Sequence, residues 1–192
     1  MVQRINKFAK ILGSGYIVCA ILFSVCFGSP IKTTPQRDKL AKIYCSYVGV
    51  TEATGHNDGV QVNQFQKATG NHTGDSWCAS FVAFCLKLLG INNIGNGMAR
   101  SWFTKAHNVW QLNVHGVKRF NELAAYRGNT GGFYFPSHHA IAHIFYIHDL
   151  KGDCVITVEG NTNNQLSREG NGCFQCKRKI KSIYAVSNWI DK

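Results

Sequence analysis

The chain has 192 residues, of which 45% are hydrophobic and 16% charged, and its formal net charge is +11. This length suits one domain, and the composition excludes an intrinsically disordered polymer. The positive charge favours an anionic partner, namely nucleic acid, an acidic membrane surface or a bacterial cell wall, without choosing among them. A solvated basic surface with no such partner would account for the charge equally well.

The N-terminus has the pattern of an export segment. Arg4, Lys7 and Lys10 form a basic head, and residues 11–28 (ILGSGYIVCAILFSVCFG) are uncharged and largely apolar. We expect residues 1–29 to be a signal peptide or a membrane anchor, which in the second case would hold the chain in the inner membrane through 11–28. The protein is accordingly expected to be exported to the periplasm or the extracellular space.

A polar linker over 30–36 is expected to lead into one domain over 37–192. Apolar periodicity and end signals predict helices over 38–48, 60–68, 75–90 and 99–110. The third of these would be capped by Asp75 or Ser76 and closed by Gly90. It is apolar nearly all round, which predicts a buried central helix.

The second half of the domain has the pattern of strands. Short apolar runs separated by turn residues predict strands over 132–135, 142–147, 154–158, 173–179 and 182–186. Residues 151–153 (Lys-Gly-Asp) indicate a hairpin turn. Helices followed by strands predict an α+β fold with a mostly antiparallel sheet of about five strands.

Eight cysteines would usually suggest disulfides in an exported chain. Their spacing shows no dense disulfide framework. Cys173 and Cys176 form a C-x-x-C without a second such pair, and positions i and i+3 of a strand face opposite sides. We therefore expect no metal site, and no residue pattern implies a cofactor.

Cys78 lies at the predicted first turn of the buried helix. The helix dipole and the free N–H groups there favour a thiolate, which is the nucleophile of cysteine catalysis. The backbone N–H of Cys78 would help to bind an oxyanion. The alternative is a small buried hydrophobic residue, which is our interpretation of Cys85 in the body of the same helix.

A nucleophilic cysteine needs a base, and histidines crowd the strand region. His143 lies in an apolar run, while His138 and His139 are rival candidates. Glu159 and Asn161 follow one hairpin later, so either would be able to orient the imidazole as the third member of a triad.

These segments, taken in order, resemble the CHAP family (cysteine, histidine-dependent amidohydrolases/peptidases), which belongs to the papain-like cell-wall peptidases. The resemblance rests on residues 77–82 (WCASFV), 50–59, 131–135 and the Glu-Gly-Asn of 159–161. In family members the histidine stands about sixteen residues before the glutamate. His143 meets this spacing and His139 does not.

The resemblance implies a papain-like fold and a peptidoglycan substrate, with no metal or cofactor. It implies that Cys78 attacks a peptide carbonyl, that His143 is the general base, and that Glu159 and Asn161 assist it. Trp77 would be a packing residue or part of the cleft wall, and substrate contacts are expected from Trp77, Asn57 and Asp58. The reaction would be that of an N-acetylmuramoyl-L-alanine amidase or a stem or cross-bridge endopeptidase, as in endolysins, secreted effectors or housekeeping hydrolases.

Two other classes of function also fit parts of the sequence. A catalytically inactive, membrane-anchored wall-binding protein would keep the fold and lose thiolate reactivity. A nucleic-acid-binding protein would use the basic run 177–181, but the export segment argues against that partner.

Overall fold

A computed structural model of the chain describes residues 30–92, 94–112, 121, 124–163 and 170–191. Among these residues three α-helices precede a six-stranded antiparallel sheet, which confirms the α+β class. The helices are α1 (Pro35–Cys45), α2 (Val60–Lys67) and α3 (Cys78–Leu88). The strands are β1 (Asn108–Gln111), β2 (Thr130–Phe135), β3 (Ala140–Lys151), β4 (Cys154–Thr162), β5 (Gly172–Lys179) and β6 (Ala185–Ser187). Three short 3-10 helices are η1 (Ala99–Trp102), η2 (Pro136–His138) and η3 (Ile180–Ser182).

The predicted export segment 1–29 lies outside the described residues. No helix in the described part of the chain is long and apolar enough to cross a membrane. The first helix begins at Pro35, inside the expected linker, because Thr34 accepts a hydrogen bond from the N–H of Arg37 and proline suits a first helical turn.

The sheet has six strands in the order β1-β6-β2-β3-β4-β5, and not the expected five. The additional strand is β1, which lies where a helix over 99–110 was predicted; that prediction was wrong. Residues 99–102 form only one 3-10 turn, and Trp110 then pairs with Val186 of β6. The pairing satisfies the backbone of an aromatic and β-branched segment and buries Trp110, which a surface helix would leave exposed.

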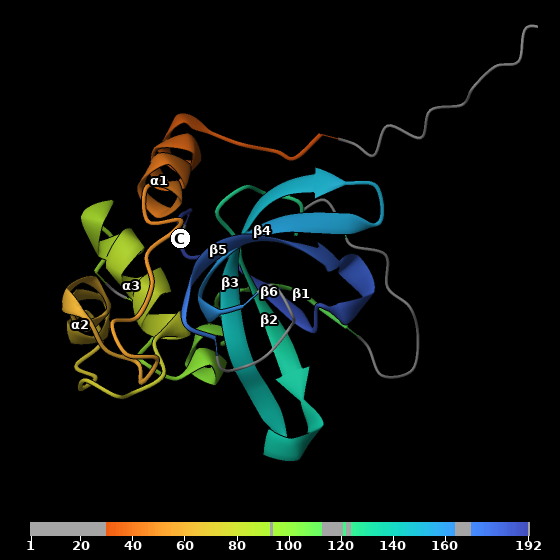
Figure 1. Cartoon of the computed structure of the whole chain (residues 1–192). Coiled ribbons are helices and arrows are strands. Elements are labelled where there is room, and N and C mark those ends of the chain that lie inside the picture. Colours follow the sequence, from red (N-terminus) through yellow and green to blue (C-terminus); the bar gives the residue numbers. More distant parts are fainter. Residues whose placement is uncertain (1–29, 93, 113–120, 122–123, 164–169, 192) are drawn as a thin grey trace, which may run out of the picture.

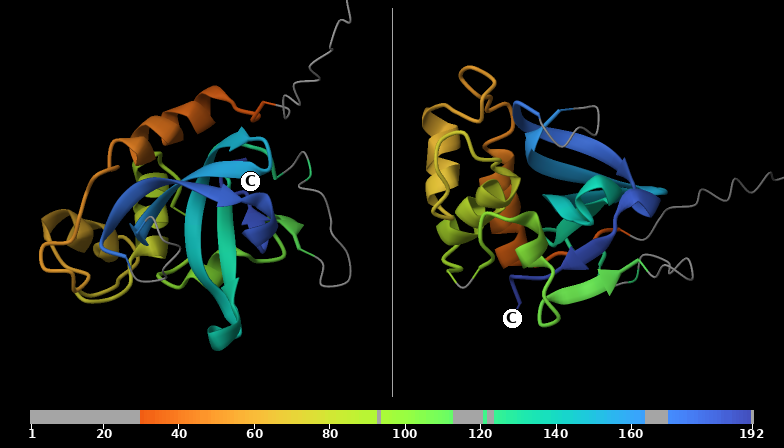
Figure 2. Two further views of the ribbon diagram at one scale, coloured as in Figure 1. Left: turned by 45° about the vertical axis from the view of Figure 1, so that its right-hand side comes forward. Right: turned by 90° about the horizontal axis from the view of Figure 1, so that it is seen from below.

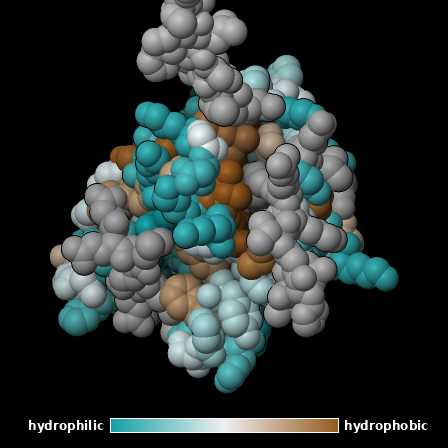
Figure 3. All heavy atoms as spheres, turned by 90° about the vertical axis from the view of Figure 1, so that its right-hand side faces the viewer, coloured by the Kyte–Doolittle hydropathy of each residue, from teal (hydrophilic) through white to brown (hydrophobic). Residues whose placement is uncertain are grey.

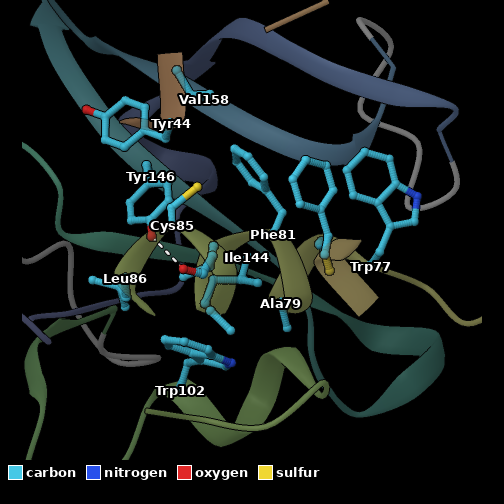
Figure 4. Close-up of a cluster of buried hydrophobic side chains, with 14 of the residues drawn as sticks. Tyr44, Trp77, Ala79, Phe81, Cys85, Leu86, Trp102, Ile144, Tyr146 and Val158 are labelled. Atoms are coloured by element: carbon cyan, nitrogen blue, oxygen red, sulfur yellow. Dashed lines mark hydrogen bonds between the residues drawn. The ribbon is translucent and has the colours of Figure 1, made fainter. Parts of the chain in front are cut away.

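The helices lie together on one side of the sheet (Figures 1 and 2), and α3 packs between the other two helices and the strands. Alternate residues of β3 enter different cores. Ile144 and Tyr146 pack against the helices, whereas Phe145 and Ile147 belong to a second cluster on the opposite face. The hydroxyl of Tyr146 donates a 2.7 Å hydrogen bond to the carbonyl oxygen of Val82, which fixes β3 to α3 (Figure 4).

The second cluster gives the sheet a partly apolar outer face. Figure 3 looks onto this side of the molecule, where a strip of hydrophobic side chains runs between hydrophilic ones. Partly buried Ile31, Leu150 and Ile180 pack against the cluster. The sheet therefore has apolar side chains on both faces.

A buried arginine joins the two ends of the domain. Arg37 of α1 is fully buried and donates hydrogen bonds to the carbonyl oxygen of Arg127 (2.6 Å) and the side-chain oxygen of Asn188 (3.0 Å). It also forms an ion pair with Asp191 at 2.5 Å. Since the partners lie 90 to 154 residues away in sequence, this clasp ties the first helix to the C-terminal end.

Candidate active site

Cys78 is the first residue of α3 and is 6% exposed. The helix was expected to be capped by Asp75 or Ser76, but neither residue caps it, because the helix begins at Cys78. Trp77 occupies the cap position and makes no side-chain hydrogen bond to the helix. The N–H groups of the first turn are thus left for the cysteine. Burial raises the pKa of Cys78. Interactions with His143 and hydrogen bonds from the backbone N–H groups of Ile144 and Ala79 lower the pKa by more, so that it lies below the ordinary value for cysteine.

His143 lies in β3 and is 2% exposed. Its Nε2 lies 2.9 Å from a carboxylate oxygen of Glu159, and its ring stacks on that of Phe133 with centroids 5.9 Å apart. The other nitrogen, Nδ1, is buried and has no nitrogen or oxygen partner among the described residues. It is therefore the nitrogen available to the thiol of Cys78.

The pKa of His143 is raised to about 9. Burial lowers it, but the interactions with Cys78 and with Glu159 raise it by more. A lowered cysteine pKa beside a raised histidine pKa favours a thiolate and an imidazolium at neutral pH. This ion pair is the reactive form of a catalytic cysteine.

Glu159 lies in β4, is fully buried and accepts two hydrogen bonds from one arginine side chain. Arg178 of β5 donates from Nε to Oε1 at 2.7 Å and from Nη2 to Oε2 at 2.9 Å. The hydroxyls of Thr157 and Thr162 also donate to the carboxylate. Burial raises the pKa of Glu159, but Arg178 and His143 outweigh it and bring the pKa to about 2. The carboxylate therefore remains ionised beside the histidine.

Cys78, His143, Glu159 and Arg178 thus form a buried line of alternating charge from α3 across three neighbouring strands. Each charge has an opposite neighbour, which offsets the cost of removing four charges from water. The expected triad comes together in this structure, and Arg178 is a fourth member that the sequence did not point to.

Asn161 lies close to the nucleophile but does not bond His143 or Glu159. Its side-chain oxygen accepts a 3.1 Å hydrogen bond from the N–H of Trp77, directly before Cys78. Its amide nitrogen donates to Asn57 at 2.9 Å. Asn161 therefore fixes the start of α3 and is a positioning residue rather than a partner of the base.

Of the two roles expected for Trp77, the structure shows packing in the core and not a place in the cleft wall or a substrate contact. Its side chain is fully buried, stacks on Phe65 with ring centroids 5.5 Å apart, and donates from Nε1 to Glu52 at 2.9 Å (Figure 4). Trp77 is therefore a core residue, held by its contact with Phe65 and its hydrogen bond to Glu52. Glu52, which the sequence did not single out, also accepts from the N–H of Asn57 and joins this loop to the core.

Asn57 and Asp58 were likewise expected to contact substrate. Asn57 has a left-handed backbone with φ of 54° and bonds Asn161 and the carbonyl oxygen of Gly74. Asp58 accepts hydrogen bonds from the N–H and the hydroxyl of Thr54. Both side chains are used within and around their own loop, and neither lines the cleft at Cys78.

An open cleft of about 600 Å³ leads to Cys78. Its walls come from the loop before α3, the segment 96–100 and the first residues of β3. The lining residues include Asn71, Asp75, Cys78, Arg100, His138 and Asn161. Of the rival histidines, His138 lines this cleft and His139 is exposed beside it, but His143 is the one that bonds Glu159.

The cysteines outside the site do not share its chemistry. All six cysteines in the described part of the chain are free thiols. Cys85 is fully buried, as expected of a core residue, and burial raises its pKa well above the ordinary value. Cys78 is therefore set apart by its surroundings.

Comparison with protein-family models and with curated protein sequences finds no match to this chain. Its resemblance to the CHAP family therefore stays a prediction. The chemistry that the site is able to perform rests on the geometry just described: a buried cysteine at a helix start that lines a cleft, a histidine beside it and a carboxylate behind the histidine.

Proposed function

We propose that this chain is a cysteine peptidoglycan hydrolase of the CHAP family with a papain-like fold. The observation that carries the proposal is the arrangement of Cys78 at the start of α3, with His143 beside it and Glu159 behind. The cleft supports it, since an opening of about 600 Å³ admits a peptide segment. The net charge of +11 suits an anionic wall.

The reaction begins when the Cys78 thiolate attacks the carbonyl carbon of the scissile amide. We assign oxyanion binding to the backbone N–H of Cys78, because N–H groups at a helix start lack intrahelical acceptors. As the carbon–nitrogen bond breaks, the His143 imidazolium gives its proton to the leaving amine and a thioester remains. His143 then takes a proton from water, the hydroxide attacks the thioester, and the acid product leaves.

Glu159 has an electrostatic task in this scheme. It stabilises the imidazolium and holds the ring so that Nδ1 faces the thiol, and it stays ionised throughout. Arg178 keeps the carboxylate in place from the other side. The proposed substrate is an amide of peptidoglycan, either the muramoyl–L-alanine bond or one within the stem or cross-bridge peptide. The proposed location is the periplasm or the cell exterior.

The test is digestion of purified peptidoglycan by the full chain, with soluble products identified by mass spectrometry. Wild type should release fragments whose masses name the bond, and Cys78→Ala should release none while remaining folded. Cys85→Ala is the matched control, since it removes a thiol from the same helix away from the cleft, and it should stay active. His143→Ala should be inactive and His139→Ala active.

Two outcomes would count against the proposal. Equal digestion by wild type and Cys78→Ala would exclude cysteine catalysis. No fragments from several wall types, together with co-sedimentation of the protein with intact wall, would instead support the inactive wall-binding protein.

A further inference from the structure

One wall of the cleft is a short, closely packed segment over residues 95–102. Trp102 is fully buried and donates from Nε1 to the carbonyl oxygen of Asn96 at 2.9 Å. A Cβ added to Gly95 would lie 2.7 Å from the Trp102 ring, and one at Gly97 would lie 2.1 Å from the side chain of Asn71. The two glycines therefore let this backbone approach its neighbours closely, which fixes the wall.

Further hydrogen bonds hold the same segment. Asn96 accepts at Oδ1 from the N–H of Met98 at 2.9 Å, and its own N–H donates to the hydroxyl of Ser101 at 3.1 Å. That hydroxyl donates to the carbonyl oxygen of Met98 at 2.8 Å. These hydrogen bonds fix the backbone before and after Arg100. The side chain of Arg100 is exposed to solvent.

Arg100 is exposed and lines the cleft together with Cys78. Its described contact is weak, a 3.3 Å approach of Nη2 to the sulfur of Met98, and no described carboxylate lies within ion-pair distance of it. Asp75 also lines the cleft, but its carboxylate accepts a 2.8 Å hydrogen bond from the N–H of His72 in its own loop. A permanent cation without a described carboxylate partner therefore lies on the wall of the cleft that Cys78 also lines.

We propose that Arg100 binds a carboxylate of the substrate, so that the enzyme selects acidic peptides whose carboxylate lies a short distance from the scissile amide. This inference rests on the proposed function. Guanidinium groups bind carboxylates through two parallel N–H···O bonds, which adds orientation to charge. The stem peptide of peptidoglycan contains D-glutamate and so supplies such a group, except where that carboxylate is amidated.

The first experiment compares two forms of one peptidoglycan preparation, native and with its carboxylates converted to amides by carbodiimide and ammonia. Wild type should digest the native form with a kcat/KM about tenfold higher. The free energy of one charge-assisted hydrogen-bonded pair in a partly enclosed cleft corresponds to a ratio of about this size. Arg100→Gln should lose this advantage and digest both forms at the rate of wild type on the amidated form. Arg100→Lys, which keeps the charge and loses the fork, should fall between.

Lys105→Gln is the matched control. Lys105 is exposed, lies five residues after Arg100 and does not line the cleft. This variant therefore loses the same charge outside the cleft. It should keep the wild-type preference. If Lys105→Gln and Arg100→Gln lost it equally, general attraction between a basic protein and an acidic wall would explain the preference, and the inference would be wrong.

A second experiment does not depend on hydrolysis of peptidoglycan. Acetyl-L-alanyl-D-glutamate and its diamide are tested for protection of Cys78 against iodoacetamide in the full chain. In wild type the acid should protect at about one tenth of the concentration that the diamide requires, and Arg100→Gln should abolish the difference. Carboxylate-dependent protection without any wall digestion would keep the anion site and reject the proposed function. Digestion that ignores both amidation and Arg100→Gln would keep the function and reject the site.

Discussion

Replacement of Arg178 by methionine should destabilise the domain strongly. The side chains of Arg178 and Glu159 are 3% and 0% exposed and share two hydrogen bonds of 2.7 and 2.9 Å. Methionine keeps much of the side-chain volume but leaves the carboxylate buried with only His143 as a charged partner. Loss of one member of a buried pair typically costs about 3–5 kcal/mol, a large share of the roughly 5–15 kcal/mol that holds a domain folded.

The assay is urea unfolding at pH 7, followed by tryptophan fluorescence, with Lys179→Met as the matched control. Lys179 is the next residue of β5, and its 2.7 Å ion pair with Asp153 is solvent-exposed, so its loss should leave the free energy of unfolding nearly unchanged. The double variant Arg178→Met/Glu159→Gln should recover part of the loss, because no unpaired carboxylate remains. If Arg178→Met were no more destabilising than Lys179→Met, the buried charge line would not have the energetic role assigned to it.

Four more outcomes follow from the site and its surroundings. The pKa of Glu159 falls from 4.5 to about 2, so its contribution to stability is present above pH 4.5 and is lost as the pH falls toward 2; Glu159→Gln should flatten this part of the urea stability curve. The pKa of His143 rises from 6.5 to about 9, so its contribution is present below pH 6.5 and is lost as the pH rises toward 9. For the same reason iodoacetamide should alkylate Cys78 at pH 7 at least about tenfold faster in wild type than in His143→Ala, and equal rates would argue against the ion pair. Gly160→Ala should cost about 1–3 kcal/mol in urea unfolding, because its Cβ would lie 2.7 Å from the Trp77 ring; an unchanged midpoint would show that this core relaxes freely.

The parts of the fold that sequence predicted well depend on local pattern. The apolar run that begins at Cys78 forms a buried helix, and the turn at 151–153 joins β3 to β4 as expected. The segment 99–110 was misassigned because its structure depends on β6, more than 70 residues later in the chain. A weak local preference for helix could not compete with strand pairing and the burial of Trp110.

The same distinction applies to the candidate site. His143 and Glu159 are separated by one hairpin, so their meeting was predictable from spacing and alternation. The contact of Arg178 with Glu159 was not predicted, because such a prediction requires the side chain of Arg178 to be assigned to one face of β5. A signal was present, since alternation in a strand puts Arg178 on the face opposite to the exposed Lys177 and Lys179.

For Trp77 the sequence left open whether the side chain packs in the core or forms part of the cleft wall. Its neighbour Cys78 faces the cleft, and a helix start offers no simple alternation from which to assign the preceding side chain. Its environment depends on Phe65 of α2 and on Glu52 of a loop. Such packing is decided only when elements distant in sequence meet.

The clasp made by Arg37 has a consequence for when the domain becomes complete. A ribosome releases the first helix long before Asn188 and Asp191, yet these late residues are partners of the buried Arg37 guanidinium, together with Arg127 and Asn129. A nascent chain that has not yet exposed residues 188–191 lacks two of the partners of Arg37, so we expect α1 to reach its final place only after they emerge. We therefore expect folding of the domain to be completed only after residues 188–191 have left the ribosome.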